Sequence, residues 1–285
     1  MRQALFYENM ENDMVRCRLC PHECVLTEGA AGLCHSRRND NGQLYSLNYG
    51  CVSSIALDPI EKKPLYHFHP GSVILSVGTT GCNFKCGYCQ NWSIAHCDAQ
   101  TMQIAPEELA EMALAYVGKG NIGVAYTYNE PSIWFEYVLE TSNLVRDRGL
   151  VNVLVTNGFI SAEPLEQILS LTDAMNIDVK AFTEGFYEKY CNGSLADVKR
   201  TVERAAQSCH VEITTLVIPS LNDSTEEISE LAQWLSTIDP NIVLHLSRFF
   251  PNYRMKEIPP TPLSTLENAR ESALVFLKHV YLGNI

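Results

Sequence analysis

Six apolar runs in the chain predict buried strands. They are SVILSVGTT (72–80), NIGVAYTY (121–128), VNVLVTNG (151–158), AMNIDVKAF (174–182), HVEITTLVIP (210–219) and NIVLHLSRF (241–249). Each run is continuous or nearly continuous in apolar residues, which is typical of strands that are covered on both faces of a parallel sheet. We therefore expect six parallel strands from residue 72 onwards.

Three segments between or after these runs have the apolar spacing of a helix, with apolar residues three or four positions apart. The three sets are Leu109, Met112, Ala113 and Tyr116; Ile228, Leu231, Ala232 and Leu235; and Leu266, Ala269, Ala273 and Leu277. Pro106 suits the first turn of the first helix, and Ser224 with Glu227 predicts a capping box on the second. Strands that alternate with helices predict right-handed βαβ units around one parallel sheet.

An α/β chain of this kind forms either a doubly wound open sheet or a full or partial barrel. No G-x-G-x-x-G motif follows the first strand, which weakens the dinucleotide-binding form of the open sheet. Glycine and proline interrupt every periodic segment before residue 72. We therefore expect two parts: residues 1–71 as a loop-rich, cysteine-containing N-terminal extension, and residues 72–285 as the α/β domain.

Charge and composition exclude several classes of partner. The chain has 21 Lys and Arg against 33 Asp and Glu, with no basic block, which argues against nucleic acid. No apolar run reaches the ~18 residues that predict a membrane span, and acids stand where a signal peptide has its apolar core. Eleven cysteines at clustered spacings favour metal thiolates over disulfides. We expect a cytoplasmic protein that does not bind membranes.

The stretch TTGCNFKCGYCQNW follows the first predicted strand and carries Cys82, Cys86 and Cys89 in a C-x3-C-x2-C pattern. Polar turns follow the other strands, and ligands of parallel sheets bind at this carboxyl edge. A structural zinc would need a fourth ligand, for which His96 and Cys97 are near in sequence. An iron–sulfur cubane on three thiolates would instead keep one iron open to N and O donors. The spacing leaves both alternatives open.

The stretch CNFKCGYC at the end of the first strand of a βα repeat resembles the radical S-adenosylmethionine superfamily. The resemblance runs from about residue 72 to the end and implies a partial (β/α)6 TIM-like barrel. It implies that Cys82, Cys86 and Cys89 hold a [4Fe–4S] cluster whose open iron binds S-adenosylmethionine. One electron then cleaves the sulfonium bond, which gives methionine and a 5′-deoxyadenosyl radical that abstracts a substrate hydrogen.

The resemblance also implies cofactor-binding residues along the strand ends. It puts Tyr88 near the adenine, and YNEP stands where family members have GGEP, so that Glu130, beside Asn129, is expected to accept the methionine ammonium. The remaining expected residues, from the turns TNG, DVK and SR, are Thr156, Asn157, Asp178, Lys180 and Ser247.

Two positions depart from the glycyl-radical-enzyme activases of that superfamily. Val155 stands where activases have a cation-binding Asp before TNG, and Thr214 stands near the place of an arginine that reaches the cofactor carboxylate. Lys180, Ser247 and Arg248 are the candidates for the missing polar contact.

Further motifs resemble the radical enzyme of the AmmeMemoRadiSam system over essentially the whole chain. They are CRLCPHECVLTEGAAGLCHSR, LDPIEKKPLYHFHPGS, HLSRFFPNYRM and VYLGNI. The resemblance implies Memo-like and AMMECR-like partner proteins, an electron donor such as ferredoxin or flavodoxin, and a chain that continues beyond GNI. Two other functions stay open: an activase that installs a glycyl radical on a partner protein, and a non-catalytic metal-binding α/β protein.

A second cysteine group lies in the N-terminal extension. Cys17, Cys20, Cys24 and Cys34 supply four soft ligands, enough for a structural zinc or a second iron–sulfur cluster, with His22 and His35 as substitutes. Unligated thiols are the third alternative.

Two further segments are tied to the predicted rim. The stretch EKKPLYHFHPG places charged and imidazole side chains near its entrance, namely Glu61, Lys62, Lys63, His67 and His69. Cys191, in the stretch EKYCNGS beyond the fourth strand, lies in a loop that we expect to face the site, whereas Cys51 and Cys209 are isolated.

Overall fold

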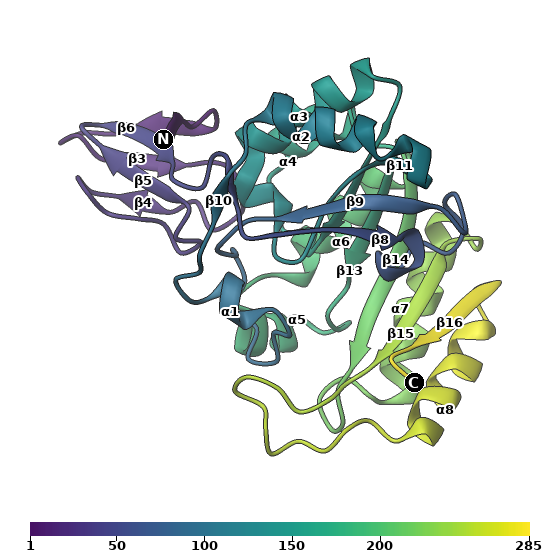
Figure 1. Ribbon diagram of the computed structural model, residues 1–285. Helices are drawn as coiled ribbons and strands as arrows, with labels where there is room; N and C mark the ends of the chain where they lie inside the picture. The colour runs from purple at the N-terminus through teal and green to yellow at the C-terminus, as the bar shows by residue number, and fades with distance from the viewer.

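A mostly parallel sheet forms the centre of the computed structural model, which describes residues 1–285 (Figure 1). The strand order is β16-β15-β14-β13-β12-β11-β9-β8. Seven strands are parallel: β9 (Val73–Gly78), β11 (Asn121–Tyr126), β12 (Val151–Thr156), β13 (Ala174–Asp178), β14 (His210–Val217), β15 (Val243–Arg248) and β16 (His279–Gly283). The six predicted strands are confirmed, and β16 is an additional one.

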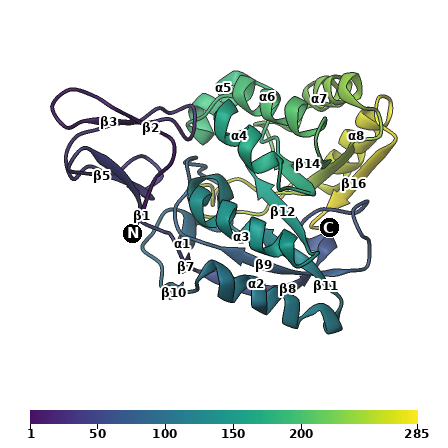
Figure 2. The same ribbon diagram turned by 90° about the horizontal axis from the view of Figure 1, so that it is seen from above.

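Helices follow one another in chain order along the outer side of this sheet (Figure 2). They are α2 (Pro106–Ala115), α3 (Phe135–Asp147), α4 (Ala162–Leu169), α6 (Leu195–Ala205), α7 (Thr225–Ile238) and α8 (Leu263–Leu274). The short helices α1 (Trp92–Ala95) and α5 (Glu184–Phe186) flank the cysteine loop region. No helix of the chain is both long enough and apolar enough to cross a membrane.

The three predicted helices are α2, α7 and α8, with two differences in detail. Only half of the predicted capping box forms on α7: the Ser224 hydroxyl accepts from the Glu227 amide at 3.2 Å. The Glu227 carboxylate instead accepts from the amide of Phe182 at 2.6 Å, which fixes the chain after β13. Leu277 lies beyond the end of α8.

The N-terminal part contains more regular structure than the sequence predicted. Two small antiparallel sheets form there: β1 (Arg2–Gln3), β6 (Gln43–Ser46) and β5 (Arg37–Asp40); and β2 (Tyr7–Asn9), β3 (Val15–Cys17) and β4 (Val25–Leu26). The β5–β6 hairpin turns at Asn41 and Gly42, both at positive φ, which is the preference of a two-residue hairpin turn. The two small sheets lie beside α3 and β10 (Met102–Gln103) in Figure 1, and β10 pairs with β7 (Cys51–Val52).

The central sheet begins before the predicted boundary at residue 72. Strand β8 (Ser54–Pro59) runs antiparallel to β9 as the edge strand, with Ser54 opposite Gly78 and Pro59 opposite Val73. Most of its residues are half-buried, and its apolar run, 55–57, is only three residues long. The residues up to 53 therefore lie outside the central sheet, and residues 54–71 form part of it and of the turn into β9.

Glu212, on β14, is a fully buried carboxylate near the N-terminal edge of the sheet. Its oxygens accept hydrogen bonds from the amides of Tyr66 at 3.0 Å and His67 at 2.7 Å. They also lie 2.9 Å from Nε2 of His210 and 2.6 Å from Nε2 of His245. This carboxylate therefore holds the segment before β9 against the edge opposite to the cysteine loop.

The expectation that EKKPLYHFHPG lies near the entrance of the rim is consequently wrong, because the segment precedes the start of β9 and the cysteine loop follows its end. Of the five residues of this set, Lys63 approaches the turn after β11: it is buried, pairs with Asp58 at 2.9 Å and lies 4.8 Å from the ring of Tyr128. The other four, which also lie in the segment before β9, are Glu61, Lys62, His67 and His69.

Glu212 predicts a specific acid sensitivity of folding. Burial by itself raises the pKa of Glu212, but the hydrogen bonds from His210, His245 and the two amides outweigh it and lower the pKa from 4.5 to about 2. The stabilisation is therefore complete above about pH 4.5 and is lost as the pH falls toward 2. We expect Glu212→Gln to be less stable than the wild type at pH 7 by about 1–3 kcal/mol. The difference should shrink as the pH falls.

Urea unfolding at a series of pH values measures this difference. Glu267→Gln, on the exposed face of α8, is the matched control and should follow the wild type throughout. A Glu212→Gln variant whose stability runs parallel to that of the wild type down to acid pH would contradict the assignment.

Candidate functional site

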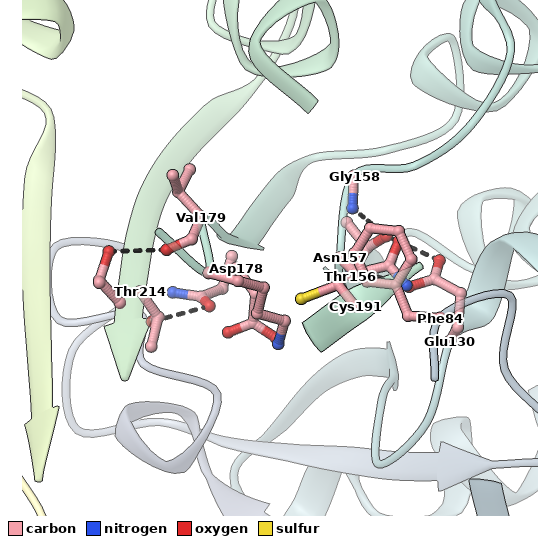
Figure 3. Close-up of polar contacts among 12 residues, drawn as sticks. Phe84, Glu130, Thr156, Asn157, Gly158, Asp178, Val179, Cys191 and Thr214 are labelled. Carbon is pink, nitrogen blue, oxygen red and sulfur yellow. Dashed lines mark hydrogen bonds and ion pairs between the residues drawn. The ribbon is translucent and has the colours of Figure 1, made fainter. Parts of the chain in front are cut away.

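The cysteine loop after β9 opens onto a cavity at the carboxyl ends of the parallel strands, with a volume of about 200 Å³. Ten of the eleven site residues predicted for the α/β domain line this cavity: Cys82, Cys86, Cys89, Tyr88, Asn129, Glu130, Asn157, Asp178, Lys180 and Ser247. Thr156 does not line it. It lies behind Glu130 and donates its hydroxyl to the Glu130 carboxylate at 2.7 Å (Figure 3).

Asn129 gives the cysteine loop its starting shape. Its side-chain oxygen accepts from the Thr79 amide at 3.1 Å, and its side-chain nitrogen donates to the Gly81 carbonyl at 2.8 Å. Gly81 has φ +91°, and a Cβ there would lie 2.4 Å from the carbonyl oxygen of Cys34. The loop therefore leaves the strand through a turn that only glycine fits and that a neighbouring strand end holds in place.

Tyr128 is the first residue of YNEP and stands at the position of the first glycine of GGEP; it adopts φ +69°. Its hydroxyl donates to the Asp58 carboxylate at 2.9 Å, so the ring forms part of the cavity wall. A tyrosine at positive φ is strained, and the hydrogen bond to Asp58 holds it there.

Glu130 is a buried carboxylate with three donors. Oε1 accepts from the Ser132 amide at 2.9 Å and from the Thr156 hydroxyl, and Oε2 accepts from the Asn157 amide at 2.8 Å. Burial raises its pKa even though these hydrogen bonds act in the opposite direction. The carboxylate links the ends of β11 and β12 and still lines the cavity, where it can accept from a cation.

Asn157 connects the end of β12 to the cysteine loop. Its side-chain nitrogen donates to Oδ1 of Asn83 at 2.8 Å, and Asn83 in turn donates to the carbonyl of Phe159 at 2.8 Å. Gly158, at φ +72°, makes the turn that follows. Asn83, adjacent to Cys82, is therefore fixed by hydrogen bonds to Asn157 and Phe159 and is fully buried.

Lys180 is the cationic side chain of the cavity lining. Its ammonium lies 2.7 Å from Oδ2 of Asp178. Burial by itself lowers the pKa of Lys180, but the charges of Asp178 and of the nearby thiols of Cys86 and Cys191 outweigh it and raise the pKa. Arg248 does not line the cavity, because its Nε donates to the carbonyl of Thr261 at 2.8 Å.

The two departures from the activase pattern are visible in the structure. Thr214 lines the cavity and donates to Oδ1 of Asn176 at 3.0 Å. Val155 packs in the small apolar cluster with Ala125 and Val153. Neither position supplies a charge, which leaves Lys180 as the cation there.

Cys191 lies close to the cysteine loop, as its sequence position suggested. It ends a π-helical turn, Tyr187–Cys191, and its sulfur lies 3.2 Å from the hydroxyl of Tyr88. In Figure 3 this sulfur points into the space between Asp178 and the Glu130 group. A Cβ on Gly193 would lie 2.2 Å from the Phe84 ring, so the turn can approach the loop only with glycine there.

His96 is a cavity residue whose role the sequence did not indicate, since it was considered only as a zinc ligand with Cys97. Both ring nitrogens are buried and have no hydrogen-bond partner. Burial lowers the pKa of His96 to about 4, so the ring is neutral at pH 7. Tyr253 stacks on it with the ring centroids 5.7 Å apart. Cys97 is exposed and lines a different cavity with His35.

The donors of the cavity fit a polynuclear cluster. Cys82, Cys86 and Cys89 line one cavity. In a cubane each thiolate bonds a different iron, so the sulfurs need not meet at one point. Burial raises the pKa of the Cys89 thiol to about 11, so a bound metal has to displace its proton.

The four N-terminal cysteines also meet in space. Cys17, Cys20, Cys24 and Cys34 line one small cavity together with His22, whereas His35 does not line it. Cys17 and Cys34 are buried, and Cys20 and Cys24 are half-buried.

Comparisons with known proteins agree with this geometry. An uncharacterized protein of Methanocaldococcus jannaschii is 41% identical over the whole of this chain and 86% of its own length. The pyruvate formate-lyase-activating enzyme of Clostridium pasteurianum is 27% identical over 55% of this chain and 67% of its own length. The crystal structure of Streptococcus suis SuiB bound to S-adenosylmethionine shares the fold, with a TM-score of 0.57 and 12% identity over 71% of this chain and 47% of that one.

The sequence profile of the Radical SAM superfamily matches residues 76–235, which is more than half of the chain and includes the cysteine loop and the ends of five of the parallel strands up to β14. Membership implies a [4Fe–4S] cluster and S-adenosylmethionine as cofactors. The chain belongs to the radical SAM superfamily.

Proposed function

We propose that the chain is a radical S-adenosylmethionine enzyme in which Cys82, Cys86 and Cys89 hold a [4Fe–4S] cluster with one open iron. The observation that carries the proposal is the set of three thiols around a cavity that also exposes a carboxylate, Glu130, and an ammonium, Lys180. An amino-acid cofactor presents the complementary pair of charges. The proposed architecture is the partial (β/α)6 barrel, with β9 and β11 to β15 as its six strands.

When bound, the cluster and S-adenosylmethionine supply one-electron cleavage to methionine and a 5′-deoxyadenosyl radical that abstracts a substrate hydrogen. The residues of the chain bind and orient. Glu130 accepts the methionine ammonium, while Lys180 and Ser247 contact the carboxylate in place of the arginine that Thr214 replaces. Tyr88 and Asn157 line the side of the pocket nearest the cysteine loop.

Within the superfamily, we favour the AmmeMemoRadiSam type over the activases. The supporting observation is the set of four motifs spread along the whole chain. The proposal includes Memo-like and AMMECR-like partner proteins, a ferredoxin or flavodoxin as electron donor, and a cytoplasmic location that keeps the thiols reduced. Many substrates fit the same barrel rim, so the fold does not select one.

An activase that installs a glycyl radical on a partner protein is the second candidate. The similarity to the activating enzyme of Clostridium pasteurianum favours it. The uncharged Val155 and Thr214 positions count against it. A non-catalytic metal protein is the third candidate, and the experiments below separate it from the other two.

The second cysteine group is proposed to bind metal as well. Cys17, Cys20, Cys24 and Cys34 line one cavity, and four thiolates suit either zinc or an iron–sulfur cluster.

Serine substitutions test the cluster assignment. After anaerobic reconstitution and reduction with dithionite, the wild type should be brown and release 5′-deoxyadenosine from S-adenosylmethionine. Cys82→Ser, Cys86→Ser or Cys89→Ser should abolish this release and lower bound iron by about four per chain, because one lost thiolate opens the cubane. Cys209→Ser, half-buried and remote from the cavity lining, is the matched control. A colourless wild type that binds zinc and cleaves nothing would support the non-catalytic candidate.

Glu130→Gln tests the ammonium contact. Loss of a charged hydrogen bond is worth about 1.5–3 kcal/mol, so the affinity for S-adenosylmethionine should fall at least about tenfold. Equilibrium dialysis with the reconstituted protein measures it. Thr156→Val removes a donor to the same carboxylate and keeps its charge, so it should weaken binding much less. Equal losses in the two variants would show that Glu130 acts only through packing.

A further inference from the structure

The four N-terminal cysteines come from two separate small sheets and meet at their junction. Cys17 ends β3, Cys20 and Cys24 lie in the turn between β3 and β4, and Cys34 precedes β5. The Cys17 amide donates to the Cys24 carbonyl at 3.0 Å. Strands of two to four residues bury little apolar surface, so a shared ligand at this junction would supply the order that the small core lacks.

Arg37 points to the nature of that ligand. The residue is 1% exposed and lines the same cavity as the four thiols. Nη1 pairs with Oε1 of Glu136 at 2.7 Å and Nη2 donates to the Ile133 carbonyl at 3.2 Å, but the buried Nε has no partner. A buried N–H without an acceptor is costly. A metal-bound thiolate is an anionic acceptor that would satisfy it.

The position of this cavity favours a redox-active cluster over a structural ion. A zinc ion could order the N-terminal sheets, but it has no redox chemistry. The four thiols share their cavity lining with Asn83, the neighbour of Cys82. This adjacency would serve a centre that transfers electrons.

The second cavity shares a wall with the cysteine loop. Asn83 lines it, and Cys82, the next residue in the chain, lines the first cavity. Nε2 of His22 lies 2.8 Å from the Asn83 carbonyl oxygen, and His22 is two residues from Cys20. A route of covalent bonds and one hydrogen bond therefore joins the two thiol sets. The Ser36 hydroxyl also donates to the Thr80 carbonyl at 3.3 Å.

We propose that Cys17, Cys20, Cys24 and Cys34 hold a second [4Fe–4S] cluster that delivers electrons to the first. The inference rests on the proposed function, because the first cluster is the acceptor. One electron leaves reduced ferredoxin or flavodoxin and reduces the second cluster from the 2+ to the 1+ state. The same electron then passes through His22 and Asn83 to the first cluster, with no bond broken and no proton moved. An electron-donor protein can approach the second thiol set from outside. Cys20 and Cys24 are half-buried, and Val25 and Leu33 beside them are 48% and 44% exposed.

Metal analysis and electron paramagnetic resonance of the anaerobically reconstituted full chain test the proposal. We expect about eight irons and eight sulfides per chain and no stoichiometric zinc. After reduction with dithionite there should be two signals, of which S-adenosylmethionine shifts only one. About four irons with one zinc per chain would overturn the second cluster and leave the proposed function intact.

A variant with both half-buried thiols replaced, Cys20→Ser with Cys24→Ser, tests the electron route. It should lose about four irons and the signal that does not respond to S-adenosylmethionine. The ratio of cleavage driven by reduced flavodoxin to cleavage driven by dithionite should fall by about tenfold or more, as is typical when the surroundings of a metal centre are lost. Cys209→Ser should leave iron, signals and ratio unchanged.

The outcomes separate the two proposals. An unchanged ratio in a double variant that has lost the second signal would overturn the relay. If that variant does not fold, the iron count and the two signals of the wild type decide the question. A wild type that shows both signals and yet releases no 5′-deoxyadenosine would contradict the proposed function while supporting the second cluster.

Discussion

The site depends on how the peptide between β9 and α1 is held open. A loop that presents three thiols to a cavity has few backbone hydrogen bonds of its own, so its shape has to come from neighbours. Asn129 supplies two hydrogen bonds at the start of the loop, and Asn157 holds Asn83 in its middle. Glu130 ties together the strand ends that carry these two amides. The turns after β11 and β12 therefore shape the cysteine loop as well as lining the cavity.

The pattern of apolar residues was sufficient to predict the strands that are buried on both faces. The rule that ligands gather at the carboxyl ends of parallel strands then placed Asn157, Asp178 and Ser247 beside the cysteines. The apolar pattern failed for the edges of the sheet. The strands β8 and β16 lie at the two edges of the sheet and are mostly half-buried, and their apolar runs, 55–57 and 280–282, are only three residues long. The small N-terminal sheets were missed for the same reason, although Asn41-Gly42 is a hairpin signal that could have revealed β5 and β6.

Local pattern also could not reveal contacts between distant segments. His96 and Arg37 become notable only in three dimensions, as buried polar groups with unpaired nitrogens. Thr156 shows the opposite case: the TNG pattern selected it, but its hydroxyl faces Glu130 and not the cavity. Which side chain of a turn reaches the cavity depends on the twist of the strand end and on its hydrogen-bond partners. Sequence spacing fixes neither of these.

The shared wall between the two thiol sets constrains how the N-terminal part can move. Gly81 lies against the Cys34 carbonyl with no room for a side chain, and Arg37 is paired with Glu136 of α3 in the interior. Displacing the N-terminal sheets would leave the Arg37–Glu136 charges unpaired, which is strongly unfavourable. It would also remove the support of the turn at Thr80 and Gly81, from which the cysteine loop starts. The N-terminal sheets are therefore part of the structure that holds the first thiol set in place, whichever metal their own cysteines bind.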